Sequence, residues 1–192
     1  MRQRCSWVTS DQIYIDYHDL EWGVAIYDEQ KLFELLSLES FQAGLSWITV
    51  LKKRDNFRKA FDNFDYQKVA NYDQAKVAEL LENKGIIRNR LKINATINNA
   101  NAFMAIQKEY LSFSNYAWSF VDGKTKVNHW QSPSQVPATS KESELFAKDL
   151  KKHGFKFLGP TTVYAFMQSA GMVMDHSIDC FRYKDLSSSK TS

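Results

Sequence analysis

The chain is poor in the residues that interrupt helices, with 7 glycines and 3 prolines among 192 residues. Long uninterrupted helices are therefore possible. No run of about 18 apolar residues is present, which argues against a transmembrane helix. The N-terminus has no apolar signal-peptide core, so we expect a cytoplasmic protein. In that compartment, the 2 cysteines do not favour a structural disulfide.

The size and charge of the chain are ordinary for a globular protein. The length suits one domain or two interleaved helical lobes over 1–186, followed by a tail at 187–192 that we expect to be disordered. The net charge of +3 permits nucleic acid as a partner without requiring it. Aromatic residues make up 14%, which invites a search for a stacking site, although a large aromatic core would account for most of the rings.

Apolar residues at helical spacing predict an all-α fold. Asp28 and Asp73 are predicted to cap helices over 29–44 and 74–82, the first with an apolar stripe that runs to Ala43. No segment shows convincing strand alternation. The other expected helical segments are 14–23, 46–54, 55–61, 88–110, 142–153 and 161–172, with a loop-rich stretch over 122–139.

The two cysteines lie near opposite ends of the chain, and each has a histidine nearby. Cys5 is followed by His18, and His176 precedes Cys180 by four residues. Two thiolates and two imidazoles complete a tetrahedral shell for Zn²⁺, with no open position for catalysis. The spacing alone is also compatible with two unrelated buried thiols and two surface histidines, which is the simpler interpretation.

Glu39 falls on the inward stripe of the predicted helix over 29–44, after Leu32, Leu35 and Leu36. A buried carboxylate is costly unless it is paired or hydrogen-bonded. Beside aromatic rings it could receive a cation or N–H donors. The alternative, which the residues alone favour, is a glutamate at the edge of an amphipathic helix with its carboxylate in water.

The segment 83–88 forms a short turn between two predicted helices, and no acidic residue occurs between Glu82 and Glu109. A helix N-terminus attracts anions, and basic residues add to that attraction. A plain helical hairpin with a solvated basic face explains the pattern equally well. The basic residues concerned are Lys84, Arg88, Arg90 and Lys92, and a second cluster that could contact phosphate or simply end a soluble helix is Lys151, Lys152 and Lys156.

Several motifs in the same order resemble the bacterial DNA-3-methyladenine glycosylase I family, within the helix-hairpin-helix DNA glycosylase superfamily. The resemblance covers about 4–180. Members of the wider superfamily typically carry a catalytic aspartate shortly after the hairpin, whereas this chain has none between Asp73 and Asp122. The narrower family shares that absence. The matching motifs are CSW (5–7), YHDLEWG (17–23), LESFQAGLSW (38–47), GIIR (85–88), GFKFLGPT (154–161) and HSIDC (176–180).

The resemblance implies roles for particular residues. Glu39 and Tyr17 would hydrogen-bond the flipped base and serve as the catalytic pair, and Trp47 would stack on the base in a pocket also lined by Trp7 and Trp22. The turn with Gly85, Ile86 and Arg88 would grip the DNA backbone, and Leu45 would fill the gap left by the flipped nucleotide. One structural Zn²⁺ joining the N- and C-terminal segments would be held by Cys5, His18, His176 and Cys180.

The implied activity is hydrolysis of the N-glycosidic bond of 3-methyladenine in alkylated double-stranded DNA, which releases the free base and leaves an abasic site. An ionised Glu39 would select the cationic base. We expect a monomer that needs no membrane. The alternatives are a non-catalytic module that binds damaged DNA, a broader alkylpurine glycosylase, and a zinc hydrolase unrelated to DNA, which the closed zinc shell disfavours.

Overall fold

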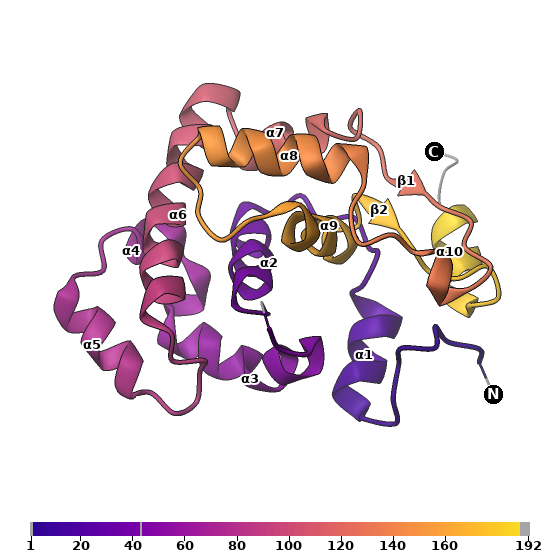
Figure 1. The fold of residues 1–192 in the computed structure, drawn as a ribbon, viewed down its shortest axis with the longest axis horizontal. Helices are drawn as coiled ribbons and strands as arrows, with labels where there is room; N and C mark the ends of the chain where they lie inside the picture. The colour runs from indigo at the N-terminus through magenta and orange to yellow at the C-terminus, as the bar shows by residue number, and fades with distance from the viewer. Residues whose placement is uncertain (1, 43, 189–192) are drawn as a thin grey trace.

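The computed structural model describes residues 2–42 and 44–188, and its fold is almost entirely helical (Figure 1). This confirms the predicted all-α class. None of the described helices is long and apolar enough to cross a membrane. The elements are α1 (Gln12–Leu20), α2 (Glu29–Gln42), α3 (Trp47–Ala60), η1 (Asp62–Phe64), α4 (Tyr66–Val69), α5 (Gln74–Glu82), α6 (Arg90–Tyr110), α7 (Phe113–Ser119), β1 (Lys126–Val127), η2 (Pro133–Gln135), α8 (Lys141–Lys152), α9 (Pro160–Ser169), β2 (Val173–Met174) and α10 (Phe181–Ser188).

Helix α2 lies at the centre of the molecule and packs against α3, α6, α7 and α9 (Figure 1). Every residue from Leu32 to Phe41 is buried. The prediction of a single inward stripe was therefore too narrow, because neighbours cover this helix on all sides. The helix ends at Gln42, and Ala43, the last member of the predicted stripe, lies outside the described residues.

Side-chain caps fix where several helices begin. The Asp28 carboxylate accepts the backbone N–H of Lys31 at 2.8 Å, and the Asp73 carboxylate accepts that of Lys76 at 2.9 Å. Both caps were predicted, and the predicted bounds of α5 are those observed. Each cap satisfies an N–H that has no partner within its own helix.

Several boundaries differ from the prediction. Residues 47–60 form one continuous helix, so the segment expected over 55–61 is the end of α3. Helix α6 begins at Arg90 and not at Arg88, because Asn89 caps it by accepting the N–H of Lys92. Helix α10 includes Ser187 and Ser188, the first two residues of the expected tail, and 189–192 lie outside the described residues.

Helix α7 was not predicted, and a local and a distant residue cap its start. The Ser112 hydroxyl accepts the backbone N–H of Asn115 at 2.9 Å. The Glu29 carboxylate, in the first turn of α2, accepts the backbone N–H groups of Phe113 and Ser114, each at 2.8 Å. A negative charge at a helix N-terminus is stabilising. The Glu29 cap joins residues more than eighty positions apart, so local sequence could have revealed only the Ser112 cap.

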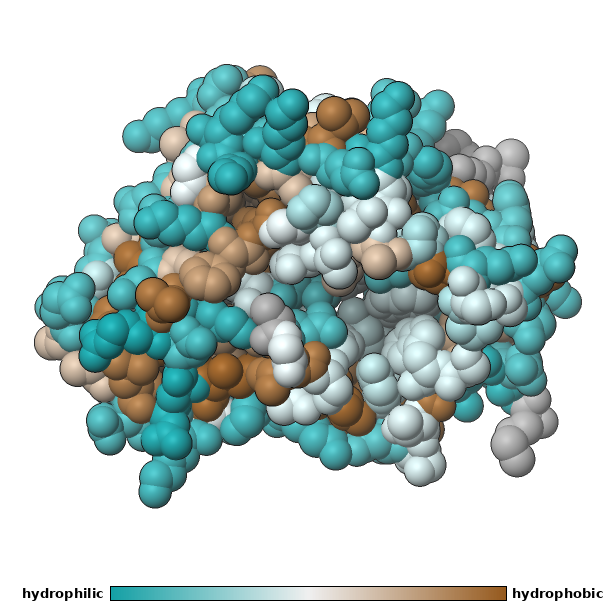
Figure 2. Space-filling model, viewed as in Figure 1, coloured by the Kyte–Doolittle hydropathy of each residue, from teal (hydrophilic) through white to brown (hydrophobic). Residues whose placement is uncertain are grey.

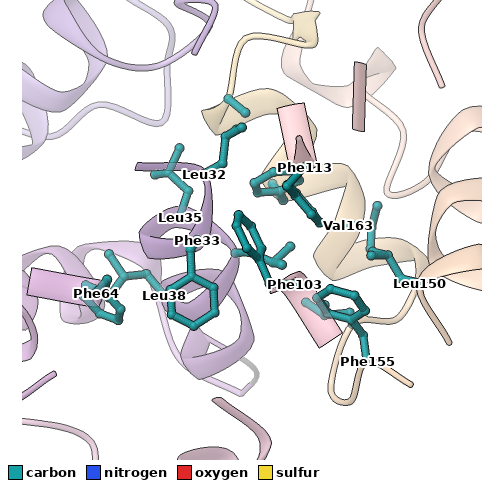
Figure 3. Close-up of a cluster of buried hydrophobic side chains, with 14 of the residues drawn as sticks. Leu32, Phe33, Leu35, Leu38, Phe64, Phe103, Phe113, Leu150, Phe155 and Val163 are labelled. Atoms are coloured by element: carbon teal, nitrogen blue, oxygen red, sulfur yellow. The ribbon is translucent and has the colours of Figure 1, made fainter. Parts of the chain in front are cut away.

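Phenylalanine rings supply much of the core, as the composition suggested (Figure 3). Phe33 of α2 meets Phe103 of α6 edge-on at 5.4 Å between ring centroids. Phe103 in turn stacks on Phe113 at 4.2 Å. Each fully buried side chain of this size contributes about 1.5–3 kcal/mol to folding. These ring contacts therefore hold α2 in a fixed position against α6 and α7.

The two short strands form a parallel pair, with Lys126 opposite Val173 and Val127 opposite Met174. No strand was predicted, because two residues are too few to show alternation. The pairing brings the segment after β1 beside the segment after β2. The N-terminal segment lies on the same side of the molecule as α10, and the N–H of Phe181 donates to the carbonyl of Gln3 at 2.9 Å (Figure 1).

We predict that Gly171→Ala strongly destabilises the protein. Gly171 has φ +70°, and an added Cβ would lie 2.3 Å from the carbonyl carbon of Val24. The backbone must shift to relieve this contact, at a cost of about 3 kcal/mol or more in the free energy of unfolding. Chemical denaturation measures it. The matched control is Gly123→Ala, which has the same φ of +70° but open space around it, and should cost only about 1 kcal/mol.

Candidate functional site

A cavity of about 260 Å³ opens on the face shown in Figure 2, between the N-terminal helices and the C-terminal third of the chain. Helices α1, α2 and α3 supply one part of its wall. The segment around 130–136, α9 and the residues after β2 supply the rest. The lining residues are Cys5, Trp7, Tyr14, Tyr17, Trp22, Glu39, Gln42, Trp47, Trp130, Ser132, Pro133, Val136, Ala165, Gln168, Asp175 and Ser177.

Glu39 lies on central helix α2 and lines the cavity with only 3% of its surface exposed. Its Oε2 atom has no hydrogen-bond partner. Burial raises the pKa of the carboxyl to about 8, and the side chain of Ser169 opposes that shift only in part. In the unliganded protein Glu39 is therefore largely protonated near neutral pH, which differs from the ionised group expected from the sequence. A cation entering the cavity would favour the ionised form.

Six aromatic side chains line the cavity together with Glu39, namely Trp7, Tyr14, Tyr17, Trp22, Trp47 and Trp130. The rings of Trp7 and Trp22 meet edge-on with centroids 5.1 Å apart, and those of Tyr17 and Trp47 lie 5.7 Å apart. The buried indole Nε1 of Trp47 also has no hydrogen-bond partner. Burial, followed by the charge of Glu39, raises the pKa of Tyr17 well above its ordinary value, so this hydroxyl keeps its proton.

This arrangement combines flat apolar surfaces with polar atoms that lack partners. Native proteins rarely leave buried polar groups unpaired, and such groups mark places where a ligand completes the hydrogen bonds. A carboxylate among indoles attracts a positive charge, and ring faces attract planar cations. The cavity is therefore suited to a flat, cationic ring with a polar edge directed at Glu39.

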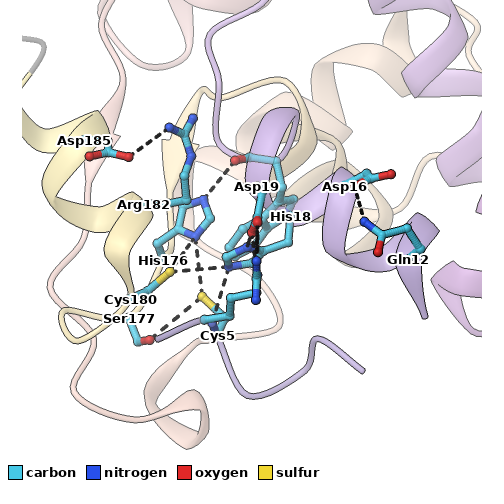
Figure 4. A network of polar contacts seen from close by, with 12 residues as sticks. Cys5, Gln12, Asp16, His18, Asp19, His176, Ser177, Cys180, Arg182 and Asp185 are labelled. Atoms are coloured by element: carbon cyan, nitrogen blue, oxygen red, sulfur yellow. Dashed lines mark hydrogen bonds and ion pairs between the residues drawn. The ribbon is translucent and has the colours of Figure 1, made fainter. Parts of the chain in front are cut away.

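Cys5, His18, His176 and Cys180 converge beside the cavity (Figure 4). All four side chains are buried, and their ligand atoms lie within 4.8 Å of one another. His176 Nδ1 lies 3.5 Å from each sulfur, and His18 Nε2 lies 3.4 Å from the Cys180 sulfur. A tetrahedral Zn²⁺ shell places sulfur and nitrogen ligands about 3.6 Å apart, so these residues could hold a metal ion.

The outer contacts of the two histidines fit metal binding. The far nitrogen of His18, Nδ1, lies 2.7 Å from the Asp19 carboxylate, and that of His176, Nε2, lies 2.9 Å from the carbonyl of Trp22. An N–H at each far nitrogen leaves the near nitrogen with its lone pair directed inward. The Cys5 thiol and the two imidazoles lower the pKa of Cys180, whereas Cys180 and burial raise the pKa of Cys5. One thiolate is thus favoured without a metal, and binding of a metal would displace the proton of the other thiol.

The cluster also supports the aromatic wall of the cavity. Trp22 packs edge-on against His176 at 4.7 Å, and Trp7 against His18 at 5.2 Å. Cys5 itself lines the cavity. The position of this wall therefore depends on the same residues that tie the two ends of the chain together.

The turn between α5 and α6 lies away from the cavity. Gly85 is closely packed, because an added Cβ would lie 3.0 Å from the Asn83 side chain and 3.1 Å from that of Asn56. The Asn83 carboxamide oxygen accepts the N–H of Gly85 at 2.8 Å. Ile86 is buried and anchors the turn, whereas Arg88 is exposed. The turn is thus closely packed and presents two exposed cations, Lys84 and Arg88.

Lys92 was wrongly placed on the exposed basic face. Only 7% of its surface is accessible, and its ammonium donates to the carbonyl of Phe41 at 3.0 Å, at the end of α2.

Leu45, predicted to fill the gap left by a flipped nucleotide, is 40% exposed between α2 and α3 and does not line the cavity. Gly44 beside it has φ +81°. The second basic cluster, by contrast, is exposed at all three positions, Lys151, Lys152 and Lys156.

Some cavity residues were not identified from the sequence. Tyr14 lies one helical turn before Tyr17, so the helical period could have revealed it. Gln42 likewise lies near Glu39 on α2. Trp130 and Asp175 depend on the pairing of β1 with β2, for which the sequence gives no signal.

Comparison with known proteins gives a consistent result. A family model described as methyladenine glycosylase matches residues 7–183. The chain is 49% identical to the DNA-3-methyladenine glycosylase of Haemophilus influenzae over 180 residues, which is 94% of this chain and 97% of that protein. It is 47% identical over 181 residues to DNA-3-methyladenine glycosylase 1 of Escherichia coli, with the same two coverages.

Solved structures also match. A crystal structure of 3-methyladenine DNA glycosylase I has a TM-score of 0.91 and 50% identity, covering 93% of this chain and 98% of that one. A structure from Staphylococcus aureus, solved to explain 3-methyladenine recognition, has a TM-score of 0.90 and 40% identity, covering 93% of this chain and 95% of that one.

Proposed function

Because the chain belongs to the methyladenine glycosylase family, we propose that it hydrolyses the N-glycosidic bond of 3-methyladenine in alkylated double-stranded DNA. The products are free 3-methyladenine and an abasic site. The observation that carries the proposal is the unpaired Oε2 of Glu39, buried in an indole-lined cavity.

The chemistry follows from the charge on the substrate. Methylation at N3 makes the adenine ring cationic and weakens its bond to the sugar. When that bond breaks, its electron pair passes to the base, and the deoxyribosyl cation that remains is captured by water, which then loses a proton. The protein must extrude the nucleotide, select the cation and hold it, and extrusion costs a few kcal/mol.

Glu39, Tyr17 and Trp47 divide these tasks. The Glu39 carboxylate accepts hydrogen bonds from the polar edge of the purine and balances its charge. The indole of Trp47 stacks on the ring, and the Tyr17 hydroxyl fixes its orientation. Trp7 and Trp22 line the same pocket. A normal adenine is neutral and gains little from the carboxylate, so the pocket selects against it.

We infer that the cysteine and histidine cluster holds one structural Zn²⁺. The four ligand atoms are close together, and both histidines have second partners that direct a nitrogen inward. When bound, the metal would supply cross-linking of the chain ends and no reaction step, since four protein ligands leave no open position.

We also propose that the turn between α5 and α6 is a helix-hairpin-helix element that grips the DNA backbone. Gly85 and Ile86 give the turn its shape, and backbone N–H groups near the start of α6 can meet a phosphate. Leu45 is the exposed side chain that would fill the space vacated by the flipped nucleotide.

The proposed activity is tested by incubating the protein with methylated duplex DNA and separating the released bases by chromatography. Release of free 3-methyladenine, with little release of 7-methylguanine, is expected. Binding to the DNA without release of any base would identify a damage-binding module. Equal release of several methylated bases would identify a broad alkylpurine glycosylase.

We predict that Arg88→Ala weakens binding to duplex DNA and reduces its salt dependence. Removing one phosphate contact lowers the slope of log affinity against log salt by about 1. Titration of fluorescent duplex at several salt concentrations measures the slope. Lys108→Ala, an exposed cation at the opposite end of α6, is the matched control and should keep the parental slope. An unchanged slope for Arg88→Ala would remove the turn from the DNA interface.

A further inference from the structure

A second carboxylate, that of Asp175, lies in the cavity wall, and both of its oxygens accept hydrogen bonds from protein side chains. Asp175 is 3% exposed and accepts four hydrogen bonds. Its Oδ1 receives Nδ2 of Asn128 at 2.7 Å and Nε1 of Trp130 at 2.8 Å. Its Oδ2 receives the hydroxyl of Tyr164 at 2.6 Å and Nε2 of Gln168 at 2.9 Å. One side chain thus joins the segment after β1 to helix α9.

Two of these donors, Trp130 and Gln168, line the cavity. Trp130 lies beyond the end of the short strand β1, in a stretch with little regular structure. It is nevertheless fixed at two points, because its indole N–H donates to Asp175 and its carbonyl accepts the N–H of Ile178 at 3.0 Å. Hydrogen bonds to a charged acceptor are about twice as strong as neutral ones.

The engaged N–H determines what Trp130 can offer a ligand. An indole has a single polar hydrogen. In Trp130 that hydrogen is used by Asp175. Trp130 can therefore present only its apolar ring to the cavity. A ring held by a carboxylate is also pre-organised, which reduces the entropy lost when a ligand binds.

We propose that Trp130 forms a second stacking wall that contacts the extruded base, and that Asp175 is the positioning residue that holds this wall in place. The proposal rests on the proposed glycosylase function. Glu39, Tyr17 and Trp47 come from the first quarter of the chain, whereas Trp130 and Asp175 come from the final third. The base is thus bounded by both halves of the protein.

The test compares Trp130→Ala, Trp130→Phe, Asp175→Asn and the control Trp118→Phe. Trp118 is also buried and donates its indole N–H, at 3.0 Å to the carbonyl of Ile26, but it does not line the cavity. Calorimetry measures the affinity for free 3-methyladenine, and single-turnover assays measure its excision. Zinc content and melting temperature are recorded for each variant, because Asp175 precedes a residue of the cysteine and histidine cluster.

Loss of a stacking ring should weaken affinity for the free base about tenfold in Trp130→Ala. Trp130→Phe retains a ring and should lose less. Asp175→Asn should weaken the affinity while zinc content stays parental, and Trp118→Phe should bind as the parent does. Parental affinity and excision in both Trp130 variants would overturn the inference while leaving the glycosylase function intact. Failure of the parent to bind or release 3-methyladenine would overturn both.

Discussion

Replacing Glu39 with glutamine is expected to reduce excision of 3-methyladenine about 100-fold or more, since preorganised charges at developing cations and anions contribute effects of this size. Glutamine keeps the shape and an acceptor oxygen but cannot become negative. The variant should fold, because the carboxyl is already largely neutral in the unliganded protein. Single-turnover release from methylated DNA measures the effect, and circular dichroism confirms the fold.

The same substitution should change the pH dependence of stability in a defined direction. The pKa of Glu39 rises from 4.5 to about 8 on folding, so between these values the folded protein holds a proton that the unfolded chain has lost. Stability of the parent therefore falls as the pH rises through this window, and the Glu39→Gln variant should not show that fall. Excision by the parent, in contrast, should rise towards about pH 8 as the carboxylate forms in the free enzyme.

Glu34→Gln is the matched control, on the same helix. Glu34 is also buried, but the hydrogen bond from Arg58 and the charge of Lys31 outweigh its burial and lower its pKa. Its loss should destabilise the protein near neutral pH without a comparable loss of excision per folded molecule. If Glu39→Gln were as active as the parent, Glu39 would have no part in the mechanism.

Removal of zinc is expected to unfold the protein and not merely to inactivate it. A structural metal contributes its binding free energy to folding. Even a loss of about 4 kcal/mol would lower the melting temperature of a protein this size by roughly 10 °C. Cys180→Ser, or prolonged chelation, should therefore lower the melting temperature and abolish excision together. Calorimetry and zinc analysis of the same samples measure both.

The pattern of losses distinguishes a structural from a catalytic metal. Chelation that abolishes excision at an unchanged melting temperature would contradict a structural role. Full activity and stability in the metal-free protein would show that the four side chains need no ion. Asp179→Ser, which changes an exposed neighbour of Cys180, should leave zinc content and stability unchanged.

Sequence patterns anticipated the elements that depend on local signals. The caps Asp28 and Asp73 and the long helix after the turn were predicted because the relevant contacts span a few residues. The family motifs identified only part of the cavity, namely Trp7, Tyr17, Trp22, Glu39 and Trp47. The structure brings Glu39, Tyr17 and Trp47 together in one cavity, and their roles in catalysis stay predictions.

What escaped prediction depends on contacts between distant segments. The second cap of α7 comes from Glu29, and Lys92 is drawn inward by the end of α2. Trp130 is held in the cavity wall by hydrogen bonds to Asp175 and Ile178. The protonation of Glu39 follows from how completely neighbours enclose α2, which a helical period does not specify. In each case the position or protonation of the side chain is determined by residues that are distant in the sequence.

The connection between the chain ends has a consequence for biosynthesis. Trp7 and Trp22 pack against a cluster whose last two members, His176 and Cys180, are translated more than 150 residues later. A nascent chain on the ribosome therefore has the carboxylate proposed to recognise the base long before it has a finished pocket. The pocket can form only after Cys180 has been synthesised, so a chain terminated before that point should not occupy damaged sites.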